Sequence, residues 1–90
     1  MDSILYTTDG ERRKVTPSNG TDFSLEELQG FVGGHIEIIR LGASKLMVIN
    51  EEGKLHNLPL NIKATGIIQL YGRNDVIVGN ALECSTDKIK

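Results

Sequence analysis

The apolar positions of this chain fall into short runs separated by turn-forming residues, a pattern typical of strands and short helices. Residues 3–16 place β-branched and aromatic side chains on both sides of Asp9-Gly10. That dipeptide accepts positive φ at both central positions of a tight turn, so this segment is predicted to form an opening β-hairpin. Pro17 is expected to end it, because proline has no backbone donor for a sheet.

The clearest helix signal comes next. Ser24 is a predicted N-cap, and Glu27 lies at the third helical position, where its side chain can complete a capping box. Phe23 and Leu28 occupy the positions of a hydrophobic staple, and Gly33-Gly34 is expected to end the helix in a left-handed cap. The side chains predicted to line its apolar face are Leu25, Leu28 and Val32.

Two apolar strands are predicted after the glycines, over residues 35–41 and 45–50. The pair Ile38-Ile39 breaks the alternation of the first strand, which indicates either burial on both faces or a bulge. A turn at Gly53 is then expected to lead into a short returning strand over residues 54–56.

The last third of the chain predicts one more helix and one more strand. Asn61 is a good N-cap for a helix over residues 62–69, and Gly66 in its middle would allow a close approach to the sheet. The segment 75–84 is interpreted as the final strand, with Gly79 as a bulge or a point of close packing.

This order of elements predicts an α+β fold. We expect one small domain over residues 1–90, with a mainly antiparallel or mixed sheet of about five strands and two short helices. Residues 85–90 are expected to be a frayed tail. Because only 4% of the residues are aromatic while 39% are hydrophobic, the core must consist mainly of aliphatic side chains.

The charge balance argues against nucleic-acid binding. The formal net charge is −2, whereas nucleic-acid binders usually carry an excess of basic residues on one face. The basic run Arg12–Lys14 is interpreted as a solvated strand edge, because charged side chains commonly protect such edges.

Other features of the sequence predict a cytoplasmic protein. The single cysteine, Cys84, rules out an internal disulfide. No apolar run approaches the roughly 20 residues of a membrane span, and the first residues lack the basic start of a signal peptide. We therefore expect no membrane association.

No motif indicates catalysis, a cofactor or a metal. His35, His56 and Cys84 are scattered singly, without the paired spacing of metal sites. The SxxK spelling of residues 85–88 is a coincidence in a tail, because that motif activates serine only within a much larger domain. We expect a protein that is not an enzyme and needs no cofactor.

One polar segment is the best candidate for a ligand site. Residues 50–61 combine carboxylates, amides and an imidazole with the start of a predicted helix. A purely structural interpretation, in which these residues form a turn and a helix cap, stays open. The candidate ligand-binding residues are Asn50, Glu51, Glu52, His56 and Asn61, together with Arg73.

An ordered series of short motifs runs through residues 23–84 and comprises Leu28-Gln29, residues 32–37, residues 50–54, residues 58–61 with Ala64-Thr65, and residues 75–80. This series resembles a family of small uncharacterised domains of bacteria, phages and other mobile elements. The resemblance implies no activity and no catalytic residues. It implies an accessory gene of a phage, plasmid or conjugative element, with Asn50, Glu51, Gly53, Pro59 and Asn61 in the characteristic motif.

Three functions follow as hypotheses. The first is a non-catalytic module that binds another protein. The second is a small-molecule or nucleotide binder that sequesters its ligand, as a homo-oligomer with a site that joins residues 50–61 to Arg73. The third is a nucleic-acid accessory factor that uses Arg12, Arg13 and Lys14.

Overall fold

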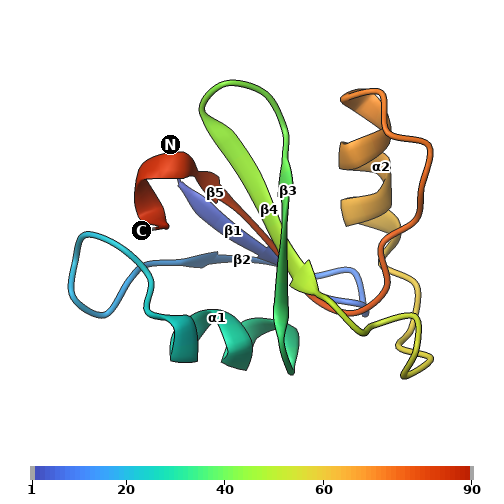
Figure 1. The fold of residues 1–90 in the computed structure, drawn as a ribbon, viewed down its shortest axis with the longest axis horizontal. Helices are drawn as coiled ribbons and strands as arrows, with labels where there is room; N and C mark the ends of the chain where they lie inside the picture. Colours follow the sequence, from blue (N-terminus) through green and yellow to red (C-terminus); the bar gives the residue numbers. More distant parts are fainter. Residues whose placement is uncertain (1, 90) are drawn as a thin grey trace.

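Five antiparallel strands and two α-helices make up the structure, a computed structural model that describes residues 2–89 (Figure 1). The strand order is β2-β1-β5-β4-β3, and every pairing is antiparallel. The predicted α+β fold is confirmed. The elements in chain order are β1 (Ser3–Tyr6), β2 (Arg12–Val15), α1 (Leu25–Val32), β3 (Ile36–Arg40), β4 (Lys45–Asn50), α2 (Ile62–Leu70), β5 (Ala81–Ser85) and the 3₁₀ helix η1 (Thr86–Lys88).

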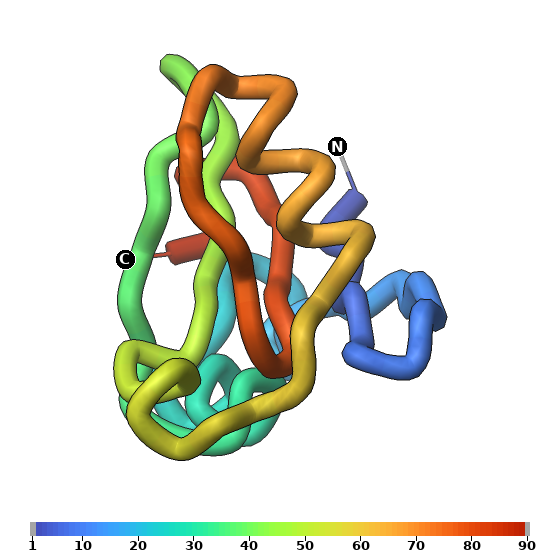
Figure 2. The backbone as a smooth tube through the Cα atoms, turned by 90° about the vertical axis from the view of Figure 1, so that its right-hand side faces the viewer, coloured from blue at the N-terminus to red at the C-terminus, as the bar shows by residue number. Residues whose placement is uncertain are grey.

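The two helices cover opposite faces of the sheet, so the core has two layers (Figures 1 and 2). Side chains alternate between faces along each strand, and in β4 Leu46 and Val48 point to α1 while Met47 points to α2. The layer under α1 contains Leu5, Phe23, Leu28, Val32, Leu46, Val48, Leu82 and Cys84. The layer under α2 contains Ile39, Leu41, Met47, Ala64, Ile68, Ile77 and Ala81.

The start and end of α1 agree with the sequence prediction. The Ser24 hydroxyl accepts from the Glu27 backbone N–H at 3.1 Å, and the Glu27 carboxylate accepts from the Ser24 N–H at 3.0 Å. Gly33 follows as a C-cap with φ of 82°. The prediction was wrong for Leu25, whose side chain is 58% exposed, whereas Leu28 and Val32 are buried.

β3 is an edge strand, which corrects the interpretation of Ile38-Ile39. Its register with β4 continues from Ile36 to Arg40 without a bulge. Ile39 is buried under α2, while Ile38 is 43% exposed on the face of α1. The two isoleucines therefore point to opposite faces as in any regular strand, and only one of them is covered.

Two predicted strands are shorter or absent. Residues 54–56 lie in a series of turns over 51–57 and form no strand. The last strand begins at Ala81 and not at residue 75, because Gly79 adopts φ of 80° and interrupts the extended chain before it. Ahead of Gly79, a single bridge joins Leu60 to Val78. The close packing predicted at Gly79 is confirmed, since a Cβ there would lie 2.8 Å from Cδ1 of Leu58.

The end of the described chain is also more ordered than predicted. Residues 86–88 form η1, and the carbonyl of Lys88 accepts a 2.8 Å hydrogen bond from the N–H of Phe23. Ile89 is partly buried against the core under α1. Residue 90, the last of the predicted frayed tail, lies outside the described residues.

The cap of α2 was predicted correctly, but its glycine was not. Asn61 caps the helix by accepting from the N–H of Ala64 at 3.0 Å. Gly66 faces solvent, and a Cβ built on it would meet no atom within 4 Å. The helix therefore approaches the sheet through Ala64 and Ile68 and not through Gly66.

Candidate functional site

Asn50, the first of the sequence-predicted site residues, fastens β4 to the end of α1. Its side-chain Nδ2 donates to the carbonyl of Val32 at 3.1 Å, and its Oδ1 accepts from the N–H of Glu52 at 2.8 Å. The residue is only 7% exposed. Its polar atoms are thus engaged within the protein, and the role that these contacts define is structural.

The loop after Asn50 presents the charged members of the predicted set. Glu51 and His56 are exposed, and Glu52 is half-buried. Nε2 of His56 lies 3.7 Å from Oε1 of Glu52, in a solvent-exposed pair that contributes little to stability. Beneath them Gly53 is buried, because a Cβ there would lie 2.9 Å from Cγ2 of Val78.

Asn61 is fully buried, and each of its side-chain atoms has a partner. Nδ2 donates to the carbonyls of Tyr6 and Gly79, at 2.9 Å in each case, while Oδ1 accepts from Ala64. This amide joins β1, the approach to β5 and the start of α2. No donor or acceptor of its side chain points to a cavity, so Asn61 shapes the fold and leaves nothing for a ligand.

Arg73 follows the end of α2. Its backbone N–H donates to the carbonyl of Ile68 at the far end of α2, whereas Asn61 caps the near end. The chain then returns to the predicted segment, because Asp75 accepts a 2.6 Å hydrogen bond from Nζ of Lys54, and this bond and the Arg73 charge both lower the pKa of Asp75. A ligand site that joins residues 50–61 to Arg73 stays a prediction.

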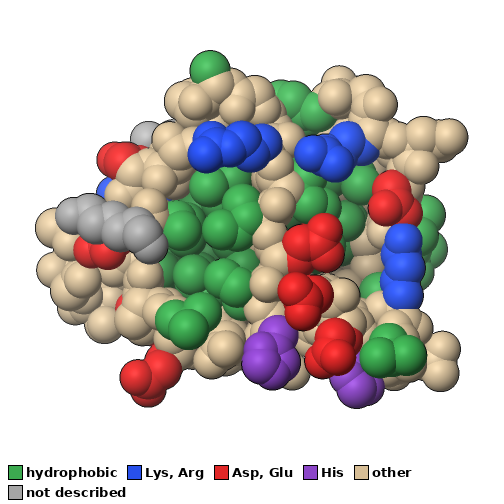
Figure 3. All heavy atoms as spheres, in the orientation of Figure 1, with side chains coloured by type: hydrophobic (Ala, Val, Ile, Leu, Met, Phe, Trp, Pro, Cys, Tyr) green, Lys and Arg blue, Asp and Glu red, His purple; other side chains and the backbone are tan. Residues whose placement is uncertain are grey.

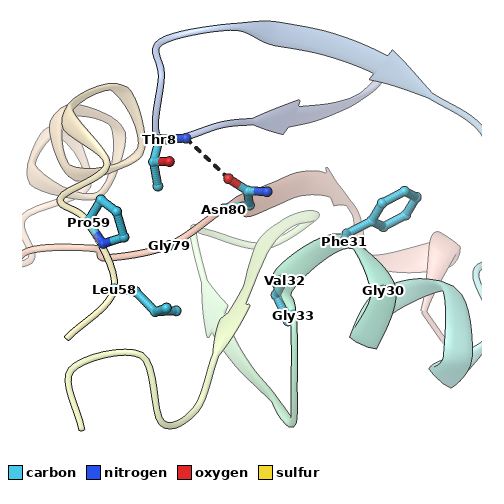
Figure 4. Close-up of a pocket in the computed structure, with 9 residues that line it drawn as sticks. All are labelled: Thr8, Gly30, Phe31, Val32, Gly33, Leu58, Pro59, Gly79 and Asn80. Carbon is cyan, nitrogen blue, oxygen red and sulfur yellow. Dashed lines mark hydrogen bonds between the residues drawn. The ribbon is translucent and has the colours of Figure 1, made fainter. Parts of the chain in front are cut away.

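The structure contains a different hollow, which the sequence did not indicate (Figure 4). It has a volume of about 210 Å³ and lies between the end of α1, the β1–β2 turn and the segments before α2 and β5. Asn80 borders it and accepts a 3.1 Å hydrogen bond from the N–H of Thr8. The residues that line it are Thr8, Gly30, Phe31, Val32, Gly33, Leu58, Pro59, Gly79 and Asn80.

The chemistry of this hollow is neutral. None of its lining residues carries a charge, and the last turn of α1 directs the negative end of its helix dipole there. Pockets for drug-sized ligands usually measure about 300–1,000 Å³, so this one accommodates no more than a small uncharged group. An anion such as a phosphate would find no cationic side chain in it.

Tyr6, Glu83 and Lys45 form a polar cluster on the α2 face of the sheet, which no sequence motif indicates. The Tyr6 hydroxyl donates to Oε1 of Glu83 at 3.0 Å, and Nζ of Lys45 lies 3.6 Å from Oε2 of the same carboxylate. Burial raises the pKa of the Tyr6 phenol, and the Glu83 charge raises it further. A hydrogen bond with Tyr71 and the Glu83 charge raise the pKa of Lys45.

The Cys84 thiol and the possible metal ligands do not form a reactive or metal-binding site within residues 2–89. Burial raises the pKa of the Cys84 thiol to about 11, which keeps it protonated and unreactive at neutral pH. Within residues 2–89, no three His, Cys, Asp or Glu side chains lie close enough together to hold a metal ion. No helix in the same range is long and apolar enough to cross a membrane.

The basic run of β2 is divided by the sheet. Arg12 and Lys14 project to one face and Arg13 to the other, because side chains alternate along a strand. Arg12 lies over the Tyr6 ring, with 5.8 Å from Cζ to the ring centroid. Arg13 pairs with Glu11 at 2.9 Å and Lys14 with Asp2 at 3.5 Å, so these cations form no single patch.

Comparison with known proteins gives one result. A family model described as "Domain of unknown function (DUF3846)" matches residues 1–90. No curated protein and no solved structure matches the chain. The match includes the opening hairpin, which the motif series of residues 23–84 left outside the resemblance. Because the match covers the whole chain, the protein belongs to the DUF3846 family of domains of unknown function.

Proposed function

We propose that this domain is a non-catalytic protein-binding module, and that its contact surface is the outward face of α2. Ile62 is 75% exposed and Leu70 is 85% exposed. With Gly66 between them they are spaced four residues apart, so all three lie along one side of the helix. This outward apolar stripe is the observation that carries the proposal.

Gly66 supports a protein partner in particular. A glycine in the middle of a helix costs about 1 kcal/mol relative to alanine, and nothing inside the domain requires its small size. A missing side chain at the centre of an exposed apolar stripe allows the backbone of a second helix to approach closely. We therefore propose that the partner presents an apolar helix to α2.

Neighbouring apolar side chains extend the stripe. Leu60 is 49% exposed and Val76 is 42% exposed. The hydrogen bond from the N–H of Asn61 to the carbonyl of Ile77, at 2.8 Å, brings their two segments side by side next to the start of α2. Single exposed apolar residues are common, but several on adjoining segments are characteristic of interaction surfaces.

The two alternatives have less support. A nucleotide or another anionic ligand lacks a cationic pocket, because the hollow beside Asn80 is lined by uncharged residues. A nucleic-acid role lacks a continuous basic surface, because β2 divides its cations between two faces. The origin that the family resemblance implies, in a bacterium, phage or mobile element, suits an accessory module that acts in the cytoplasm by occupying another protein.

Site-specific photo-cross-linking in cells that naturally express the protein tests this proposal. A benzophenone amino acid at position 70 is expected to give a discrete product with another protein, and Gly66→Glu in the same chain is expected to abolish it. The matched control places the probe at Leu25, which is 58% exposed on α1. Equal products from both positions, or none from position 70, would contradict the proposal.

A further inference from the structure

We propose that two copies of this chain associate through their β3 edges, which pair antiparallel about a two-fold axis at Ile38 and form one continuous sheet. This inference is independent of the contact proposed for α2. β3 pairs with β4 on one side only, and in Figure 2 no described segment lies beyond it on the other. An open edge of this kind is a template for pairing with another strand.

Every second residue of β3 directs its backbone N–H and C=O groups away from β4. The carbonyl of His35 accepts from Glu51 at 2.8 Å and the N–H of Leu41 donates to Lys45 at 2.9 Å, so odd-numbered residues direct their backbone groups to β4. The backbone groups of Ile36, Ile38 and Arg40 therefore point outward. Among residues 2–89 they have no hydrogen-bond partner.

With a two-fold axis at Ile38, all of these outward backbone groups form hydrogen bonds between the two copies. Ile38 then faces Ile38 of the second copy as a hydrogen-bonded pair, and Ile36 of each copy faces Arg40 of the other. The three outward residues are spaced symmetrically about Ile38, so each N–H meets a carbonyl and none remains unpaired. A strand from an unrelated protein would satisfy the same groups only where its own register happened to fit.

The side chains agree with this register. The two Ile38 side chains meet at the axis on the face of α1, where each is 43% exposed in the single chain. The aliphatic stem of each Arg40 covers Ile36 of the other copy. Glu37 faces Ile39 on the opposite face, so no like charges stand directly opposite one another.

The two ends of the β3 edge carry opposite charges, so two antiparallel copies are electrostatically complementary. In Figure 3, Lys and Arg side chains lie along the upper rim and at the right, Asp and Glu side chains lie on several sides and in the middle, and the His side chains lie at the lower edge. Arg40 stands at one end of β3, while Glu51 follows the residue that pairs with its other end. Antiparallel pairing sets the basic end of each copy against the acidic end of the other.

The opposite edge explains why association would stop at two copies. β2 carries Arg12, Arg13 and Lys14 in succession, and pairing two such strands would place cations against cations. Because the two-fold axis is perpendicular to the sheet, both α2 helices lie on the same side of the combined sheet. The dimer thus presents two outward α2 faces to a partner, which raises its avidity.

Analytical ultracentrifugation of the purified chain and of variants at position 38 tests the inference. The native protein is expected to have about twice the 9.9 kDa mass of one chain at submillimolar concentration. Ile38→Pro removes an outward N–H and leaves the β3–β4 hydrogen bonds intact, so this variant is expected to be a folded monomer. Lys14→Pro makes the same change at an outward position of β2 and is expected to remain dimeric.

A pair of charged variants checks the register itself. Ile38→Lys and Ile38→Glu are each expected to be monomeric, because like charges meet at the axis, while an equimolar mixture recovers the dimer. Circular dichroism confirms that each variant is folded. A monomeric native protein, a dimer that persists in Ile38→Pro, or a mixture that stays monomeric would each overturn the inference.

Discussion

The side-chain Nδ2 of Asn61 donates a 2.9 Å hydrogen bond to the carbonyl of Tyr6, which joins the start of α2 to the end of β1 across 55 residues of sequence. The same nitrogen reaches Gly79, and the oxygen of the same side chain caps α2. One buried amide therefore positions three segments of the domain. The apolar stripe of α2 keeps its orientation through this contact.

Replacing Asn61 is expected to destabilise the whole domain. Asn61→Ala removes the helix cap and the two hydrogen bonds that its Nδ2 donates to the carbonyls of Tyr6 and Gly79, which together cost about 2–4 kcal/mol. Urea unfolding measures the loss, and Asn74→Ala, an exposed asparagine, serves as the control. A cost equal to that of the control would show that the Asn61 amide does not hold these segments together.

Gly53 is expected to tolerate no side chain. A Cβ at this position would lie 2.9 Å from Cγ2 of Val78 and 3.2 Å from its carbonyl oxygen, so Gly53→Ala must displace the chain before β5. We expect a loss of about 1–3 kcal/mol in the free energy of unfolding. Glu52→Ala, at the neighbouring position, is expected to stay within about 0.5 kcal/mol of the native protein. Similar values for the two variants would rule out a tight contact at Gly53.

The hydroxyl of Tyr6 is expected to stabilise the sheet through Glu83. Tyr6→Phe leaves a buried carboxylate oxygen without its donor, at a cost of about 1–3 kcal/mol. Tyr71→Phe is the comparison, because Tyr71 is 45% exposed and its loss is expected to be smaller. Thermal unfolding measures the loss of stability in each variant. A larger loss in Tyr71→Phe than in Tyr6→Phe would contradict a stabilising role of the Tyr6–Glu83 hydrogen bond.

Cys84 is expected to be unreactive in the folded protein. Its pKa is raised from 9.0 to about 11 by burial, so the thiolate is scarce at pH 8 and the sulfur is inaccessible. Iodoacetamide labelling followed by mass spectrometry should proceed only after denaturation. Rapid labelling of the native protein at pH 8 would show that the thiol is accessible.

The raised pKa of Cys84 also predicts that the stability of the domain depends on pH. The unfolded chain releases the Cys84 proton near pH 9.0 and the folded chain only near 11, so stability falls as pH rises through this interval. Cys84→Ala is expected to reduce that slope, measured by urea unfolding between these pH values. An unchanged slope would assign the loss to other groups, such as Tyr6, whose pKa is also raised.

Local features of the structure could be predicted from the sequence. Ser24 and Asn61 were identified as caps, because a cap depends on residues three positions away. The end of α1 at Gly33 follows from the same short-range geometry. The hairpin around Asp9-Gly10 forms as predicted, but its turn does not have the predicted geometry, because it spans residues 7–11 and only Gly10 of the pair adopts a positive φ, of 92°. The exposed face of Ile38 could not be predicted, because it depends on which strand forms the edge of the sheet.

The candidate site illustrates the same limit of sequence patterns. The polar residues of the segment 50–61 predict a ligand site, although the side chains of Asn50 and Asn61 form their hydrogen bonds within the fold. The hollow beside Asn80 is built from segments far apart in the chain, and the pairing of Tyr6 with Glu83 spans 77 residues. No spacing within a short window indicates such contacts.

The most direct test of the α2 surface compares two glycines that lie in helices and have open space around them. A Cβ at Gly30 or at Gly66 would meet no atom within 4 Å, so alanine at either position is expected to raise stability by about 0.5–1 kcal/mol. Cross-linking yield from a probe at position 70 is then measured for both variants. We predict that Gly66→Ala lowers the yield while Gly30→Ala preserves it. Full yield from Gly66→Ala would contradict the proposal, and a loss in Gly30→Ala would assign the contact to the hollow at the end of α1 instead.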